Sequence, residues 1–259
     1  MADTEPWLET TLVELAEALD ERPSETGYAW VLTARLSERL APAGVCFMLA
    51  IKVGGLAVTA ASSDEVSKLA ALQARLGEGP CIDCLRTGQE VLNAAVTAAD
   101  DLWPSFVPAA RASGFGTLSA LPMRSREQAI GVIFWAAAEA QQLAGRDLRE
   151  LRVLARMTAI TLAQLRESRR NAMAAEQLQQ ALDSRVLIEQ AKGAVAARLG
   201  VSPDRAFDLL RGYARQANLT LAEVSTQAIG NVLSPHDLMA RAGTHRADQV
   251  RLRRVPQSR

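Results

Sequence analysis

A stretch of 47 residues without glycine or proline, from Arg146 to Lys192, constrains this chain more than any other feature. It consists mostly of Ala, Leu, Arg, Glu and Gln, which are strong helix formers. Helical patterns longer than about 25 residues are typical of coiled coils. The stretch therefore predicts one long helix that joins two shorter regions of different character.

One side of this predicted helix carries a repeat with alternating spacings of three and four residues. Its members, mostly apolar, are Leu151, Leu154, Thr158, Thr161, Leu165, Ser168, Ala172, Ala175, Gln179, Leu182 and Val186. Such a seam predicts a parallel homodimer that pairs through the long helix. The alternative is that the helix packs against the N-terminal region of its own chain.

The region before the long helix has the pattern of an α+β domain. The predicted helices cover 8–19, 27–40, 64–76 and 103–112, and the predicted strands cover 45–51, 56–60, 90–94, 118–123 and 129–135. Tight connections within the strand pairs favour antiparallel pairing. The expected fold class is α+β, with an antiparallel sheet flanked by helices.

The region after the long helix is expected to be wholly helical between residues 184 and 233. Gly200 has the position of a helix C-cap, and Ser202 that of the next N-cap. Thr220 and Glu223 have the spacing of a capping box for a third segment. Three helical segments, the first continuous with the long helix, predict a small three-helix bundle.

The charge of the chain is unevenly distributed, although its formal net charge is zero. Residues 184–259 contain twelve Arg or Lys and six Asp or Glu, a net charge of +6, so residues 1–183 carry −6. The C-terminal part is therefore suited to a polyanionic partner. Residues 236–259 are expected to be a disordered basic tail, either a solubilising terminus or a source of additional phosphate contacts.

The segment VLIEQAKG, from Val186 to Gly193, and the residues after it resemble the ANTAR domain, an RNA-binding module of bacterial antitermination regulators. The first region resembles a GAF sensor domain of the kind found ahead of ANTAR in actinobacteria. The shared motifs are GEGPC at 77–81, the Trp103-Pro104-x-Phe106 segment, Leu121-Pro122 and Ile130-Gly131-Val132. The expected domains are a GAF-like sensor at 1–145, a coiled-coil signalling helix at 146–183, an ANTAR-like domain at 184–235 and the tail.

The resemblance implies a dimer that binds paired stem-loops in nascent transcripts and promotes transcription antitermination. It also implies control by the GAF-like domain through a signal, which can be a small-molecule ligand. The candidate RNA-binding residues are Lys192 in the Ala-Lys-Gly signature, Arg198, Arg211 and Arg215. Arg211 and Arg215 lie one helical turn apart, opposite the predicted buried stripe, so both can reach one RNA surface. An ion pair with Asp208 is an alternative role for Arg211.

Two further functions are compatible with the residues. A basic three-helix bundle also suits a DNA-binding transcription factor with a GAF sensor. Cys81 and Cys84 have the spacing of a redox motif, so a cysteine-based redox sensor is an alternative to two ordinary thiols. His236 and His245 lie far from these cysteines, and glycine-rich nucleotide loops and catalytic triads are missing. We therefore expect no enzyme, no metal and no cofactor.

The apolar runs of the chain are short. None reaches the roughly 18 to 20 residues that a membrane span requires. The first residues also lack the basic start and the apolar stretch of a signal peptide. We expect a cytoplasmic protein without a membrane partner.

Overall fold

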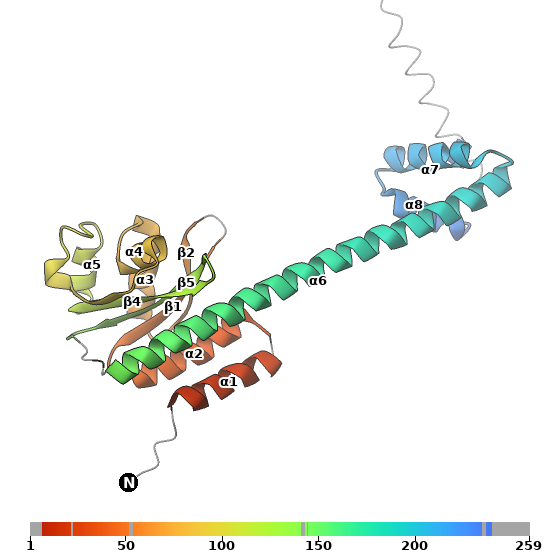
Figure 1. Cartoon of the computed structure of the whole chain (residues 1–259). Coiled ribbons are helices and arrows are strands. Elements are labelled where there is room, and N and C mark those ends of the chain that lie inside the picture. The colour runs from red at the N-terminus through yellow and green to blue at the C-terminus, as the bar shows by residue number, and fades with distance from the viewer. Residues whose placement is uncertain are drawn as a thin grey trace, which may run out of the picture. The chain divides into compact units, whose positions relative to one another are not determined.

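The computed structural model describes residues 7–21, 23–51, 54–140, 143, 145–234 and 237–239. These residues form two compact units, which we call the sheet domain, up to Arg169, and the helical domain, from Arg170. Helix α6, Gly145–Leu199, contributes residues to both. Figure 1 shows the helices and strands of each domain.

A five-stranded antiparallel sheet forms the centre of the sheet domain (Figure 1). Its strands lie in the order β2-β1-β5-β4-β3, so β1, β5 and β4 are each hydrogen-bonded on both sides. The strands are β1 (Gly44–Ala50), β2 (Leu56–Ala61), β3 (Val91–Ala95), β4 (Thr117–Ser125) and β5 (Gln128–Ala137). Each lies within two residues of a predicted strand, and the predicted α+β fold class is confirmed.

Both faces of this sheet are buried, and the side chains of each strand alternate between two cores. In β1, Phe47 belongs to one core, and Cys46 and Met48 belong to the other. A strand buried on both faces needs no polar residues, which is why β1 and most of β5 are apolar runs. The first core includes residues of α1 (Trp7–Glu21), α2 (Glu25–Arg39) and α6, and the second includes residues of α3 (Asp64–Leu76), α4 (Pro80–Thr87), the short helix η1 (Val96–Ala98) and α5 (Val107–Ala112).

The first part of α6 is a structural element of the sheet domain. Leu151, Leu154 and Thr158 are buried in the first core. The hydroxyl of Tyr28 on α2 lies 3.2 Å from Oγ1 of Thr158, which satisfies both buried hydroxyl groups. The predicted seam is therefore wrong over this part of the helix. The alternative, packing of the helix against its own N-terminal region, is what the structure has here.

Ion pairs also connect this part of α6 to the rest of the sheet domain. Arg166 donates two hydrogen bonds, of 3.0 and 3.1 Å, to the carboxylate of Glu25 at the start of α2. Arg152 makes a similar two-bonded pair with Glu90, which precedes β3. Pairs of this exposure contribute about 0 to 1 kcal/mol each, so they fix the position of the helix more than they stabilise it.

The helical domain contains the C-terminal part of α6, followed by α7 (Pro203–Ala217) and α8 (Leu221–Ile229). The predicted caps are confirmed. Gly200 has a left-handed φ of 61°, Ser202 caps α7, and Thr220 and Glu223 form a capping box. The buried core consists of Ala191, Val195, Ala206, Leu210, Ala214, Val224, Ala228, Leu233 and Leu238.

The predicted tail coincides only in part with the described residues. Residues 240–259 lie outside them, so the prediction of disorder there has no structural counterpart. Leu238, by contrast, is buried in the core of the helical domain. The packed structure thus extends past residue 235, where the sequence analysis ends the domain.

Between its two packed ends, α6 has a bare segment. Every residue from Arg170 to Asp183 is exposed. Met173, Leu178 and Leu182 in this segment are 64%, 68% and 58% exposed. Isolated helices of this length are only marginally stable in water.

We expect Leu154→Ala to lower the free energy of unfolding of the sheet domain by about 2 to 5 kcal/mol, because it leaves a cavity under a helix that covers the sheet. Denaturant titration followed by tryptophan fluorescence measures this, since all four tryptophans, at 7, 30, 103 and 135, belong to this domain. Leu102→Ala, at a site that is 65% exposed, is the control and should change the free energy by less than about 0.5 kcal/mol. Equal losses in both variants would contradict the assigned packing.

Candidate functional site

The exposed side of α7 carries a pair of arginines. Arg211 and Arg215 lie one turn apart on this helix, and both are exposed. Within the part of the chain that the structure describes, neither has a carboxylate within 4.0 Å. The ion pair of Arg211 with Asp208, which the sequence permits, is therefore not formed. The two guanidinium groups are available to an external anion.

The charges along α7 follow a definite order. Asp204 and Asp208 occupy its N-terminal half and Arg211 and Arg215 its C-terminal half, all at spacings of three or four residues. This order stabilises the helix through its macrodipole, independently of any ligand. The N-terminal half also carries the exposed Arg205, so its net charge is −1 and that of the C-terminal half is +2. A polyanion is therefore attracted mainly to the C-terminal half of α7.

Lys192 and Gly193 lie on α6, in the helical domain. Lys192 Nζ is 2.6 Å from Glu189 Oε2, and the lysine side chain is 23% exposed. A phosphate group must compete with Glu189 for this cation, at a cost of about 0 to 1 kcal/mol. A Cβ added at Gly193 would meet no atom within 4 Å, so packing inside the domain does not require glycine. The surface beside Lys192 is therefore open to an approaching molecule.

Arg198 has a structural role. Its Nη1 donates a 2.6 Å hydrogen bond to the carbonyl oxygen of Ala228, in the last turn of α8. Carbonyl groups in the last turn of a helix lack partners within the helix, so the arginine satisfies one of them. Arg198 is thus engaged in a hydrogen bond that joins α6 to α8, unlike Arg211 and Arg215 on α7, which have no carboxylate partner among the described residues.

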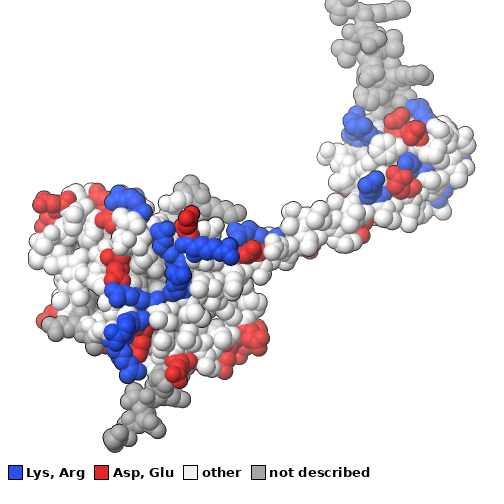
Figure 2. Space-filling model, viewed as in Figure 1, with Lys and Arg blue, Asp and Glu red and all other residues white. Residues whose placement is uncertain are grey.

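The net positive charge of the C-terminal part is small within the folded domain. Residues 184–234 contain six Arg or Lys and four Asp or Glu, so most of the excess comes from the residues that follow. Figure 2 shows basic and acidic groups side by side on the visible face of this domain. Any attraction for a polyanion therefore depends on local groups such as the α7 pair.

The three cysteines form part of the second core of the sheet domain. Cys46, Cys81 and Cys84 are free thiols with no exposed surface. Cys81 and Cys84 lie on α4, a helix that the sequence analysis does not predict, and both face the core. Burial raises the pKa of Cys46 and of Cys84 to about 12, and that of Cys81 well above its ordinary value. Thiols that stay protonated react slowly, which disfavours the redox-sensor alternative.

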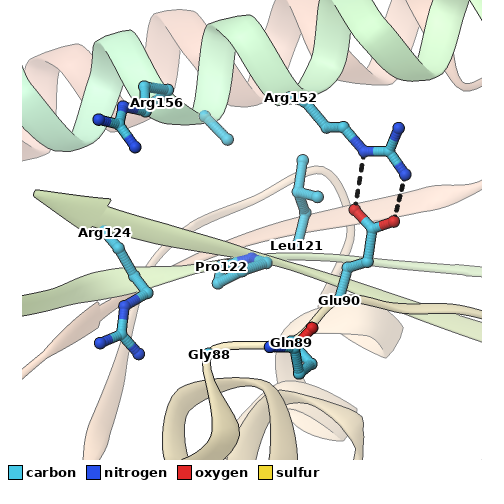
Figure 3. A pocket seen from close by; sticks show the side chains of 9 residues that line it. Gly88, Gln89, Glu90, Leu121, Pro122, Arg124, Arg152 and Arg156 are labelled. Carbon is cyan, nitrogen blue, oxygen red and sulfur yellow. Dashed lines mark hydrogen bonds and ion pairs between the residues drawn. The ribbon is translucent and has the colours of Figure 1, made fainter. Parts of the chain in front are cut away.

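The sheet domain, in which the resemblance allows a small-molecule ligand, contains a pocket whose lining residues the sequence does not mark. It is lined by residues of three separate segments: 88–90, 121–124 and 152–156. Three arginines and one glutamate are among them (Figure 3). Because the segments are far apart along the chain, no local motif marks the pocket.

Two kinds of site are missing from the described ranges. No group of three or more His, Cys, Asp or Glu side chains is placed to hold a metal ion there. No helix among these residues combines the length and the apolar character that a membrane crossing requires.

Two domain families match the chain. Residues 8–163 match the GAF domain, and residues 176–229 match the ANTAR domain. The GAF match covers the sheet domain with the first part of α6, and the ANTAR match covers the end of α6 with α7 and α8. No curated protein is significantly similar in sequence to the chain.

Solved structures resemble part of the chain at low sequence identity. A free methionine-R-sulfoxide reductase from Neisseria meningitidis is 17% identical, with a TM-score of 0.48, and the match covers 62% of this chain and 91% of that one. The GAF domain of an Acinetobacter phosphoenolpyruvate-protein phosphotransferase is 12% identical, with a TM-score of 0.47 and coverage of 62% and 96%. The phycoerythrobilin-bound GAF domain of a cyanobacterial phytochrome is 14% identical, with a TM-score of 0.48 and coverage of 62% and 97%.

We expect the cysteines of the folded protein to resist alkylation. At a pKa of about 12 only a very small fraction of Cys46 and Cys84 is thiolate at pH 8, and burial excludes the reagent as well. Iodoacetamide labelling followed by mass spectrometry should find slow modification whose rate rises from about pH 7 to about pH 9.5 without levelling off. The denatured protein should react quickly at all three thiols. Rapid labelling of native Cys81 or Cys84 that levels off near neutral pH would contradict this result.

Proposed function

Because this chain belongs to the GAF domain family and also carries an ANTAR domain, we propose that it is a signal-responsive RNA-binding regulator. Both domains are regulatory, and ANTAR domains form a family of RNA-binding antitermination regulators. In this proposal the helical domain binds stem-loops in nascent transcripts and promotes antitermination. The sheet domain controls it, and the protein acts in the cytoplasm without catalysing a reaction.

The observation that carries the proposal is the free arginine pair inside the ANTAR match. Arg211 and Arg215 are exposed and have no carboxylate partner within the described residues. Basic side chains commonly hold the phosphates beside an RNA loop while the loop bases supply specificity. The aromatic residues nearby, Phe207 and Tyr213, are half-buried. Hydrogen bonds and charge, rather than base stacking, should therefore supply most of the binding free energy.

In this proposal Lys192 contacts RNA together with the α7 pair, whereas Arg198 has an indirect role. The Lys192–Glu189 pair is exposed enough to exchange with a phosphate group. Arg198 already donates to Ala228 and supports the domain that presents the other cations. Its contribution to RNA binding is therefore through the fold of the domain.

We further propose that two copies pair in parallel through the bare segment of α6. Because the seam positions Leu151, Leu154 and Thr158 are buried within the chain, pairing begins after them. The remaining positions from Ser168 to Val186 are mostly apolar, and Leu182 and Val186 are 58% and 56% exposed. Removing such side chains from water stabilises a dimer by about 25 cal/mol per Å² of apolar surface. A dimer also supplies two helical domains for two stem-loops.

We expect Lys192→Ala, Arg211→Ala and Arg215→Ala each to weaken binding of an RNA with two tandem stem-loops. Each lost phosphate contact should reduce the slope of log affinity against log salt by about 0.7 to 1. Fluorescence anisotropy at several salt concentrations measures both effects, and circular dichroism should show unchanged helicity. Arg86→Ala, which removes an exposed arginine from the sheet domain, is the matched control.

Arg198→Ala and a DNA competitor complete this test. Arg198→Ala should lower the thermal stability of the helical domain, because a carbonyl of α8 loses its partner. Duplex DNA with the same number of phosphates should compete poorly with the RNA at fixed salt. Preference for the DNA would overturn the proposal in favour of a DNA-binding transcription factor.

We expect Leu182→Glu to shift the protein from dimer to monomer. The substitution puts one carboxylate from each chain into the proposed apolar contact between the two helices, where burying an unpaired charge is unfavourable. Sedimentation equilibrium measures the shift in mass. Gln177→Glu adds the same charge to the same segment outside the seam, and it should leave the dimer intact. A wild-type protein that stays monomeric at all concentrations, with and without RNA, would refute pairing through this helix.

A further inference from the structure

The pocket that the sequence does not mark is lined by residues of α6, of β4 and of the segment that precedes β3. Its volume is about 320 Å³, at the lower end of the range for small-molecule sites. Leu121, Pro122 and Ala155 supply an apolar lining, and Leu121 and Ala155 are buried. Leu121 belongs to the first core, so the pocket opens on the side of the sheet that α6 covers.

The polar groups around this pocket are mainly arginines (Figure 3). Arg124 comes from β4, and Arg152 and Arg156 lie one turn apart on α6. Glu90 is the one carboxylate among the lining residues, and both of its oxygens accept hydrogen bonds from Arg152. This pairing lowers the pKa of Glu90, so the carboxylate is ionised at neutral pH. The lining therefore carries a net charge of +2.

Two of the three guanidinium groups lack a carboxylate partner. Arg124 donates a 3.1 Å hydrogen bond to the carbonyl oxygen of Glu127, and Arg156 has no partner within the described residues. Figure 3 shows both arginines on one side of Pro122, with the Arg152–Glu90 pair on the other side. Uncompensated cations around one hollow repel one another, and a bound anion removes that repulsion.

The backbone beside the pocket accommodates Arg124. Gly88, at the end of α4, has a φ of 71°, and a Cβ on it would lie 2.3 Å from Arg124 Nη1. A larger residue would thus require both a strained backbone and displacement of the guanidinium group. Glycine at this position keeps Arg124 at the wall of the pocket.

From these observations we propose that the pocket binds a small metabolite with two or more negative charges, carried by carboxylate or phosphate groups. Guanidinium groups recognise both groups through paired hydrogen bonds. Arg124 and Arg156, which have no carboxylate partner, contact the anion, and the apolar lining accepts its carbon skeleton. Glu90 occupies Arg152, so Arg152 does not bind the anion, and the negative charge of Glu90 limits how much negative charge a ligand can carry.

Such a ligand acts on α6 directly. An anion shared by Arg124 and Arg156 joins β4 to α6, next to the existing link between Arg152 and Glu90. Occupancy therefore stabilises the packed arrangement of the first part of α6 over any other arrangement. Control of RNA binding through this helix rests on the proposed function, whereas binding of the anion does not.

The experiment titrates the full-length protein with citrate, with inorganic phosphate and with the monoanion acetate, using isothermal titration calorimetry without RNA. We expect saturable binding of citrate or phosphate and none of acetate. Binding of citrate alone assigns the site to carboxylates, and binding of phosphate alone assigns it to phosphate compounds. If neither citrate nor phosphate shows saturable binding, the inference is overturned.

Variants locate the binding. Arg124→Gln and Arg156→Gln should each weaken it about tenfold or more, as expected for loss of a charged hydrogen bond. Glu90→Gln should strengthen it, because the carboxylate that competes for Arg152 is removed. Arg75→Gln removes the same charge from α3, on the other side of the sheet, and should change affinity less than twofold. Equal effects of Arg75→Gln and Arg156→Gln would show a nonspecific charge effect and overturn the site.

The outcome is independent of RNA binding. A protein that binds the anion but no stem-loop keeps this site and loses the proposed function. A protein that binds stem-loops but neither polyanion keeps the function and loses this site.

Discussion

The burial of one side of the sheet beneath α6 is the constraint on which the other features depend. The central strands are apolar on both faces, so each face needs helices to cover it. On one face this cover is completed by α6, through Leu151, Leu154 and Thr158. The buried hydroxyl group of Thr158 is hydrogen-bonded to that of Tyr28. Because these residues are buried within the chain, they cannot also form a contact with a second chain. Helix α6 also brings Arg152 and Arg156 to the pocket that they line together with residues of β4.

Helix α6 thus has three environments along one continuous element. Its first part packs on a sheet, its middle is bare, and its end packs on α7 and α8. The apolar residues of each part serve a different purpose, and no single face is apolar over the whole length. In the proposed function, α6 is the connection through which a change in the sheet domain reaches the helical domain.

Much of the fold could be predicted because its local signals agree with its packing. The strands are apolar runs between turns. The helix ends of the helical domain have capping residues that the sequence shows directly, namely Gly200, Ser202 and Thr220. The predicted seam is wrong at Leu154 because apolar residues spaced three and four apart are found both on helices that pack within a chain and on helices that pair between chains. The spacing alone does not distinguish the two. Helix α4 is not predicted because it is only eight residues long, too short for a helical repeat of apolar residues to show in the sequence. The bond from Arg198 to Ala228 and the arginine pocket join distant segments, so no local pattern reveals them.

The bare segment from Arg170 to Asp183 links its own order to the proposed pairing. Its fourteen helical residues have no tertiary cover, so they are held mainly by backbone hydrogen bonds and by the packed helix on either side. In the proposed dimer, pairing adds side-chain contacts that only the helical form can make, and the degree of pairing rises with protein concentration. Concentration would then set, in this proposal, the stiffness of the connection between the two domains.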